Sequence, residues 1–163
     1  MFEDGKIAAD STDGAGLMAA LAEQAPDLDL VGRPVVVLGA GGAARAALVA
    51  LLDHGGRVIV INRSPARARS LAEAFGCAWA PWAALAETEA DVLINTTPLG
   101  MFPETDQTPL AAELLPRFGG VLDTIYNPLT TRLLKEAAAA GCRTRSGVGM
   151  FVAQGAGQIR LWT

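Results

Sequence analysis

The sequence predicts an α/β fold, a doubly wound parallel sheet of about six strands with helices on both faces. Two observations lead to this prediction. Strand-like runs alternate with helical runs along the chain, as they do in parallel sheets. The first of these runs is β-branched without polar alternation, as expected for a strand that is buried on both faces. The 163 residues are 51% hydrophobic and 18% charged, a charged fraction below the usual quarter.

The strand-like runs come in a regular order. They are "PVVVLG" from Pro34, "RVIVIN" from Arg57, a short run near "CAWA" from Cys77, "DVLINTTP" from Asp91, "GGVLDTIYNP" from Gly119 and "CRTRSG" from Cys142. Parallel strands joined by right-handed crossovers allow few topologies. We therefore expect the spatial order 3-2-1-4-5-6, which is the Rossmann type.

Helical runs follow most of these strands. They cover residues 44–55, 65–76, 130–141 and 149–162. A further helix is expected over residues 12–23, ahead of the first strand, where a minimal unit of this fold needs none. We therefore divide the chain into a connecting helix, residues 1–25, and a Rossmann domain, residues 26–163.

Composition disfavours several classes of function. The formal net charge of −4 argues against nucleic-acid binding. The only histidine is His54, and Cys77 and Cys142 stand far apart, so we expect no metal site and two buried thiols. Glycines and Arg45 interrupt the longest apolar region, residues 34–52, which argues against a membrane span. We expect a soluble cytoplasmic protein.

A glycine-rich turn follows the first predicted strand. Gly39, Gly41 and Ala44 form the pattern G-x-G-x-x-A. Gly39 would permit a tight turn, Gly41 would let the backbone approach a pyrophosphate, and Ala44 would let helix and strand pack closely. An ordinary glycine-rich turn is the alternative. The flanking strand and helix favour dinucleotide binding.

The second predicted strand ends without the acid that holds the ribose of NAD. Asn62, Arg63 and Ser64 stand there instead, and Arg67 follows one helical turn later. A guanidinium can bind a phosphate bidentately, so these residues predict the 2′-phosphate of NADP(H). The alternative is that Ser64 caps a helix and the arginines form a solvated face.

Several motifs coincide with one family. The segments "STDGAG", "GAGGAAR", "NRSPAR", "INTTPLGM", "DTIYNPLTT" and "GVGMFVAQ" resemble the NADP-binding domain of shikimate dehydrogenases. Ser11 departs from the family's usual asparagine before Thr-Asp-Gly. The resemblance implies the reversible, NADPH-dependent reduction of 3-dehydroshikimate to shikimate.

The resemblance also implies roles for individual residues. It assigns the pyrophosphate to Gly39, Ala40, Gly41, Gly42 and Ala43, the 2′-phosphate to Asn62, Arg63, Ser64 and Arg67, and the nicotinamide half to Thr97, Thr124 and Gly147. It assigns the substrate to Asp13, which would act beside the catalytic lysine, and to Tyr126 and Gln154. From the residues alone, Asp13 could equally be a first-turn acid, Tyr126 a strand-end aromatic and Gln154 an exposed helix residue.

The resemblance further implies a partner for this chain. In the family, an N-terminal substrate domain carries the catalytic lysine, which neither Lys6 nor Lys135 matches. We expect that domain in cis or in trans, and we expect the 163 residues alone to be inactive. A quinate/shikimate dehydrogenase relative with relaxed cofactor choice, or an NADP(H)-binding module without catalysis, are the alternatives. We also expect an exposed apolar face near Leu17, Met18, Met150 and Phe151, which would favour a homo-oligomer.

Overall fold

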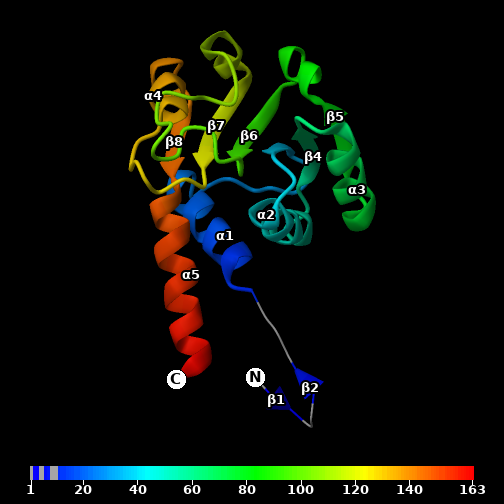
Figure 1. Ribbon diagram of the computed structural model, residues 1–163, viewed down its shortest axis with the longest axis vertical. Coiled ribbons are helices and arrows are strands. Elements are labelled where there is room, and N and C mark those ends of the chain that lie inside the picture. Colours follow the sequence, from blue (N-terminus) through cyan, green and yellow to red (C-terminus); the bar gives the residue numbers. More distant parts are fainter. Residues whose placement is uncertain (1, 4–5, 8–10) are drawn as a thin grey trace.

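A six-stranded parallel sheet forms the centre of the computed structural model, which describes residues 2–3, 6–7 and 11–163 (Figure 1). Its strands lie in the order β5-β4-β3-β6-β7-β8, and every neighbouring pair is parallel. In chain order they are β3 (Pro34–Leu38), β4 (Arg57–Asn62), β5 (Ala78–Pro81), β6 (Ala90–Asn95), β7 (Phe118–Asp123) and β8 (Arg143–Ser146). The predicted fold class and the order 3-2-1-4-5-6 are confirmed.

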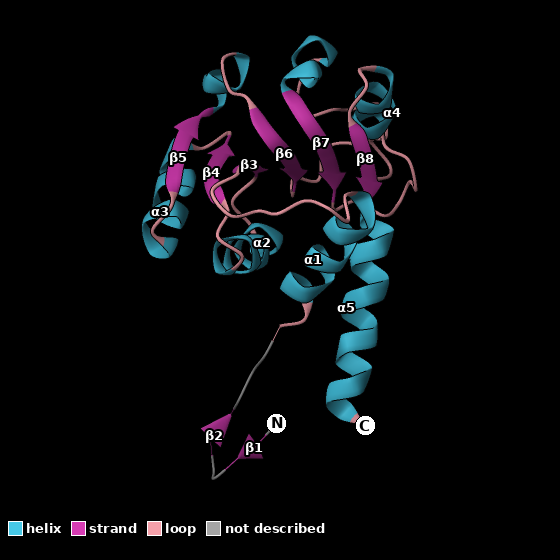
Figure 2. Ribbon diagram, turned by 180° about the vertical axis from the view of Figure 1, so that it is seen from behind, coloured by secondary structure: helices cyan, strands magenta, loops and turns pink. Residues whose placement is uncertain are grey.

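Helices cover both faces of this sheet (Figure 2). One face packs against α1 (Asp13–Gln24), α2 (Gly42–Asp53), α3 (Pro65–Phe75) and α5 (Gly147–Trp162). The other packs against α4 (Arg132–Ala139) and two short 3-10 helices, η1 (Trp82–Ala86) and η2 (Ala112–Arg117). Successive residues of β3 alternate between the two cores: Val35 and Val37 belong to the first, Val36 and Leu38 to the second. This is why the run shows no polar alternation.

The strand register lines up the carboxyl ends of the strands. Leu38 is paired with Asn95, Asn95 with Asp123, and Asp123 with Ser146. The residues that follow each of these positions therefore emerge along one edge of the sheet. This edge carries most of the residues that the sequence singles out.

Helix α1 packs closely into the first core. Leu17 is fully buried and Met150 of α5 nearly so, so the expectation that both are exposed is wrong. Gly16 permits this packing, because a Cβ there would lie 2.7 Å from the carbonyl oxygen of Met150 and 3.0 Å from Cβ of Gln154. The α1 helix is found where it was expected, and the domain boundary at residue 25 stays a prediction.

Some elements were not predicted. Besides η1 and η2, Phe2–Glu3 (β1) and Lys6–Ile7 (β2) form a short antiparallel pair. Cys142 is buried, as expected, but Cys77 is only half-buried. It stands one residue before β5, an edge strand that only β4 flanks.

Candidate functional site

A cavity of about 600 Å³ opens at the carboxyl ends of β3, β4 and β6. Strand β3 lies between β4 and β6, so the cavity stands where the strand order reverses, the usual ligand site of open α/β sheets. Seven residues proposed from the sequence line it: Gly39, Ala40, Gly41, Asn62, Arg63, Arg67 and Thr97.

The turn after β3 has the form that the glycine pattern predicts. Gly39 adopts a φ of +111°, and a Cβ there would meet the hydroxyl of Thr96 at 2.5 Å. Gly41 is the N-cap of α2, and a Cβ added to Gly41 or Gly42 would meet no atom within 4 Å. Ala44 is fully buried against the sheet. Gly41 also lines the cavity, so the start of α2, with its free N–H groups, lies beside it, which suits an anion.

The arginines after β4 divide into two kinds. Arg69 lies 3.8 Å from Glu73 and packs over the ring of Trp79 at 5.3 Å. Arg63 and Arg67 are exposed, line the cavity, and have no acidic partner within 4 Å among the residues described. Their charges are therefore available to an anion in the cavity.

Ser64 occupies the N-cap position of α3, as the alternative interpretation expected, but its side chain accepts no capping hydrogen bond. Instead, Asn62 Nδ2 donates to the carbonyl oxygen of Ser64 at 3.1 Å. This bond holds the turn that carries Arg63. The cap of α3 does not explain why Arg63 and Arg67 face the cavity.

A second cavity of about 370 Å³ continues the first along the sheet edge. The two share Thr96, Thr97 and Pro98, and the second extends to Thr124 and Tyr126. Together they form an elongated crevice from Arg67 to Tyr126. Such a crevice suits a long ligand that is anionic at one end.

Gly147 lies directly behind Thr124. Its N–H donates to the carbonyl oxygen of Ile125 at 3.0 Å, and a Cβ there would clash with the carbonyl of Thr124. Only glycine lets the start of α5 approach the end of β7 so closely. Gly147 thus shapes the crevice wall without lining either cavity.

Three polar side chains are fully buried beneath the crevice: Asn95, Asp123 and Thr131. Asp123 accepts hydrogen bonds from Asn95 Nδ2 at 3.0 Å, from the N–H of Ile125 at 3.2 Å and from the Thr131 hydroxyl at 2.6 Å. Burial raises the pKa of Asp123 from 3.8 to about 6, although these hydrogen bonds oppose the shift. The cluster joins β6, β7 and the start of α4 under the site.

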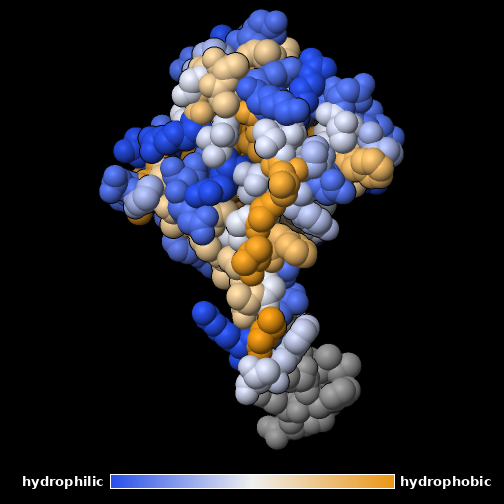
Figure 3. Space-filling view, turned by 90° about the vertical axis from the view of Figure 1, so that its left-hand side faces the viewer, coloured by the Kyte–Doolittle hydropathy of each residue, from blue (hydrophilic) through white to orange (hydrophobic). Residues whose placement is uncertain are grey.

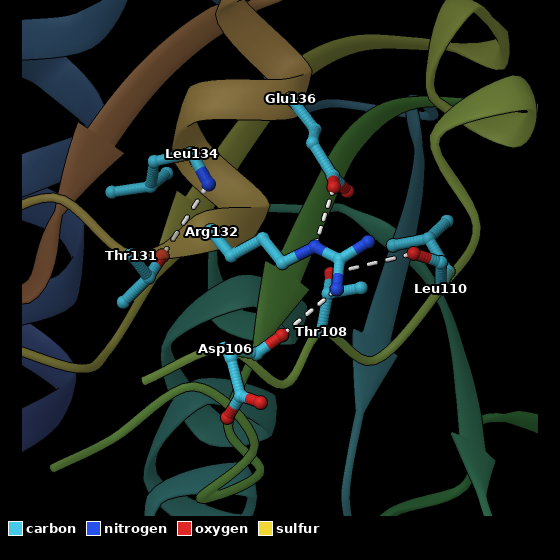
Figure 4. A network of polar contacts seen from close by, with 7 residues as sticks. All are labelled: Asp106, Thr108, Leu110, Thr131, Arg132, Leu134 and Glu136. Atoms are coloured by element: carbon cyan, nitrogen blue, oxygen red, sulfur yellow. Dashed lines mark hydrogen bonds and ion pairs between the residues drawn. The ribbon is translucent and has the colours of Figure 1, made fainter. Parts of the chain in front are cut away.

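The first turn of α4 also holds the outer wall of the crevice (Figure 4). Arg132 donates to the carboxylate of Glu136 at 2.6 Å and to the carbonyl oxygen of Asp106 at 2.9 Å. The second bond ties α4 to the loop that brings Thr108 to the cavity. Thr131, beside Arg132, accepts from the N–H of Leu134 as the N-cap of α4.

The residues proposed to bind the substrate are only partly brought together. Tyr126 lines the second cavity, is 52% exposed, and stacks on Phe151 with 4.7 Å between ring centres. Asp13 and Gln154 line neither cavity. Asp13 is the first residue of α1, and Gln154 Nε2 donates to the carbonyl oxygen of Phe151 in its own helix at 3.0 Å.

Six further residues line the larger cavity without having been given a role from the sequence: Trp82, Thr96, Pro98, Leu99, Thr108 and Pro109. Trp82 directly follows β5, so its place after a strand's carboxyl end was a usable signal. Thr108 and Pro109 come from a loop without a periodic pattern, which the bond from Arg132 to Asp106 ties to α4.

The residues present fit a phosphorylated dinucleotide. The crevice offers an open helix start at Gly41, two exposed cations, and hydroxyls at Thr97 and Thr124. No cluster of three metal-ligating side chains occurs in the described part of the chain. Among the described helices, none is long and apolar enough to cross a membrane.

Comparison with known proteins yields one family. The family model for shikimate / quinate 5-dehydrogenase matches residues 20–99. A shikimate dehydrogenase (NADP(+)) of Methanosarcina acetivorans is 47% identical over 170 residues, which cover 99% of this chain and 60% of that protein.

Solved structures agree with this result. Shikimate 5-dehydrogenase of Thermus thermophilus, in complex with NADP(H) and shikimate, superposes with a TM-score of 0.85 at 42% identity, over 99% of this chain and 59% of that one. Quinate dehydrogenase of Corynebacterium glutamicum, in complex with NAD, gives 0.85 at 31% identity, over 94% and 57%. The chain thus spans about 60% of the length of the curated relatives that it matches.

Proposed function

Because the chain belongs to the shikimate dehydrogenase family, we propose that it is the NADP(H)-binding part of an enzyme that reversibly reduces 3-dehydroshikimate to shikimate. Such an enzyme would work in the cytoplasm. The cofactor would supply the hydride. The chain's own residues would hold the cofactor, orient its nicotinamide ring and contact the substrate.

The observation that carries the proposal is the pair of exposed arginines at the end of β4. Arg63 and Arg67 line the cavity where an NAD enzyme carries an acid. A carboxylate there would repel a 2′-phosphate, whereas two guanidinium groups attract it. Asn62 and Ser64 hold the backbone that presents Arg63.

The rest of the cofactor would follow the crevice. The residues from Gly39 to Ala43 place the start of α2 where its free N–H groups can bind the pyrophosphate. Thr97 and Thr124 would then flank the nicotinamide ring, with Gly147 supporting that wall. Trp82 and Pro109 offer flat apolar surface at the other end, beside the arginines, which suits an adenine ring.

We further propose that a substrate domain, in cis or in trans, completes the site. The relatives are longer than this chain, and Tyr126 is half exposed at the end of the crevice. Asp13, Tyr126 and Gln154 would contact the substrate from this side. Asp13 would hold a substrate hydroxyl as a carboxylate acceptor.

Cofactor choice tests the proposal. Charge-assisted hydrogen bonds contribute about 1.5–3 kcal/mol, so calorimetry should show NADP⁺ binding about ten- to a hundredfold more tightly than NAD⁺. Arg63→Ala should lose most of that preference while keeping its affinity for NAD⁺. Arg69→Ala is the matched control, because Arg69 is held by Glu73 and Trp79. Equal affinities for both cofactors in the unmodified chain would refute the proposal.

An activity assay tests the proposal that a substrate domain completes the site. The chain has two lysines, of which Lys135 is exposed on α4 and lines neither cavity. Losing general acid–base help costs about 10²–10⁴-fold in rate. We therefore expect the 163 residues to bind NADPH without detectable shikimate oxidation, and activity to return when a substrate domain of a relative is added. Full activity of the 163 residues alone would contradict this.

Quinate dehydrogenation is the second candidate, because one structural relative is a quinate dehydrogenase solved with NAD. The exposed Arg63 favours a phosphorylated cofactor and so argues against that relative's cofactor choice. Assays of the restored enzyme with quinate and shikimate, each with NAD⁺ and NADP⁺, separate the two candidates. Cofactor binding with no turnover of either substrate would indicate a binding module without catalysis.

A further inference from the structure

A relay of hydrogen bonds leads from the buried Asp123 to the crevice. Asn95 Nδ2 donates to Asp123 Oδ1 at 3.0 Å, and Thr97 Oγ1 donates to Asn95 Oδ1 at 2.7 Å. We propose that this relay fixes the Thr97 hydroxyl as a hydrogen-bond acceptor toward the ligand, and that it thereby selects the amide NH₂ of the nicotinamide ring. The inference rests on the proposed function and adds a specificity determinant to it.

The direction of the relay follows from Asp123. An ionised carboxylate only accepts hydrogen bonds, and Asp123 Oδ1 already accepts from the N–H of Ile125 at 3.2 Å. The Asn95 amide must therefore turn its NH₂ toward Asp123 and its oxygen toward Thr97. The backbone N–H of Thr97, which donates to the same oxygen at 3.0 Å, enforces the same orientation.

Thr97 is left with acceptor capacity only. A hydroxyl has one hydrogen to donate and two lone pairs, and the hydrogen is used on Asn95. One lone pair receives the N–H of Leu99 at the long distance of 3.4 Å, which leaves the other for a ligand. The hydroxyl hydrogen of Thr96 is also used within the protein, because it is donated to the carbonyl oxygen of Leu38 at 2.6 Å. The hydroxyls of Thr96 and Thr97 thus both present lone pairs.

The group that these hydroxyls select can be identified from the rest of the crevice. If Arg63 binds the 2′-phosphate and Gly41 the pyrophosphate, the nicotinamide end reaches the stretch between Thr97 and Thr124. The only N–H donor of that ring is its amide NH₂. A ring with an acetyl group instead carries a methyl in place of the NH₂, which has no hydrogen to donate to the Thr96 and Thr97 lone pairs, and the loss of that hydrogen bond weakens binding.

Three cofactors that differ at this group provide the test. NADP⁺ and its thionicotinamide analogue both carry the NH₂, whereas the 3-acetylpyridine analogue does not. By calorimetry at neutral pH, we expect the first two to bind alike and the third to bind about three- to tenfold more weakly. Thr97→Val should bring all three within about twofold of one another, since one net hydrogen bond is removed. Thr97→Ser should restore the order.

Asn95→Leu tests the relay itself. It keeps the volume but removes the acceptor, so the Thr97 hydroxyl becomes free to donate. The affinity of the acetylpyridine analogue should then lie within about twofold of the affinity of NADP⁺, because one oriented hydrogen bond is lost. If this variant does not fold, the comparison of Thr97→Val with Thr97→Ser tests the inference. A discrimination that persists in Thr97→Val would overturn the inference.

The fragment 2′,5′-ADP, which lacks the nicotinamide, separates this inference from the proposed function. It should bind the unmodified chain and all three variants equally, because the arginines that would hold it are unchanged. Failure to bind the unmodified chain would refute the proposed function. Binding of the fragment, together with equal affinities for all three cofactors, would refute only the selection by Thr97.

Discussion

At the scale of single residues, Asp123 has the most consequential environment. It is an ionisable side chain without exposed surface, placed where β7 ends beneath the crevice. Three donors satisfy it, from β6, from its own loop and from the N-cap of α4. Buried carboxylates with shifted pKa values often mark functional sites. Here the same bonds orient Asn95 and hold the first turn of α4.

The raised pKa of Asp123 makes stability depend on pH. A pKa of about 6 in the folded state, above 3.8, means that the folded chain binds this proton more tightly than the unfolded chain. Proton binding by Asp123 therefore stabilises the folded state below about pH 4, and this stabilisation is lost as the pH rises through 6. The difference of about two pKa units corresponds to roughly 3 kcal/mol of unfolding free energy.

Asp123→Asn isolates that contribution, because the asparagine does not titrate. We expect the unfolding free energy of the unmodified chain, minus that of the variant, to fall between about pH 4 and pH 7 by up to roughly 3 kcal/mol. Urea titrations at several pH values measure it. Parallel pH profiles for the two proteins would show that Asp123 does not titrate in this range.

At the scale of elements, the contact between α1 and α5 determines where the site's last wall lies. Gly16 lets the two helices touch, and α5 in turn begins at Gly147 against β7. Tyr126, in the loop after β7, stacks on Phe151 of α5. A displacement of α5 would therefore move the part of the crevice that Tyr126 lines.

Two glycine substitutions probe this contact. Gly16→Ala would place a Cβ 2.7 Å from the carbonyl oxygen of Met150, and such overpacking costs about 1–3 kcal/mol. Gly155→Ala, inside α5, meets no atom within 4 Å and should stabilise the helix by up to about 1 kcal/mol. Denaturant unfolding should show opposite signs. A neutral Gly16→Ala would mean that α5 can shift without cost.

At the scale of the whole molecule, α5 leaves an apolar stripe exposed. Figure 3 shows hydrophobic residues running down the side of the molecule on which α5 lies. The exposed apolar side chains of this helix are Phe151, Val152, Ile159, Leu161 and Trp162, each between 44% and 74% exposed. Exposed apolar patches of this kind favour association. A substrate domain or a second copy of the chain could cover it.

For the 163 residues alone, we expect association that increases with concentration in sedimentation velocity. Changing Val152 and Ile159, one heptad apart on α5, to lysine should shift the chain toward monomer. Val49→Lys is the matched control, since Val49 is 48% exposed on α2, away from the stripe. A chain that stays monomeric at all concentrations would contradict the expectation.

Much of the fold and part of the site could be predicted from the sequence. Unalternated runs and terminal glycines predicted the strands and helices, because parallel strands are buried on both faces. The pattern from Gly39 to Ala44 predicted the open helix start. The absence of an acid at the end of the second strand, where Asn62 stands, predicted that Arg63 and Arg67 would face an anion site. These are local features, in which neighbours in sequence are neighbours in space.

By itself, the sequence determined the strand order, the glycine turn and the basic end of the crevice, because each depends on local conformation or on a topology with few alternatives. Only the tertiary structure decided the burial of Leu17 and Met150, the place of Trp82 and Thr108 in the cavity wall, and the relay from Asp123 to Thr97. Those depend on how segments far apart in the chain pack. An apolar helix face, or a polar residue at a strand end, does not itself indicate whether a neighbour or solvent will meet it.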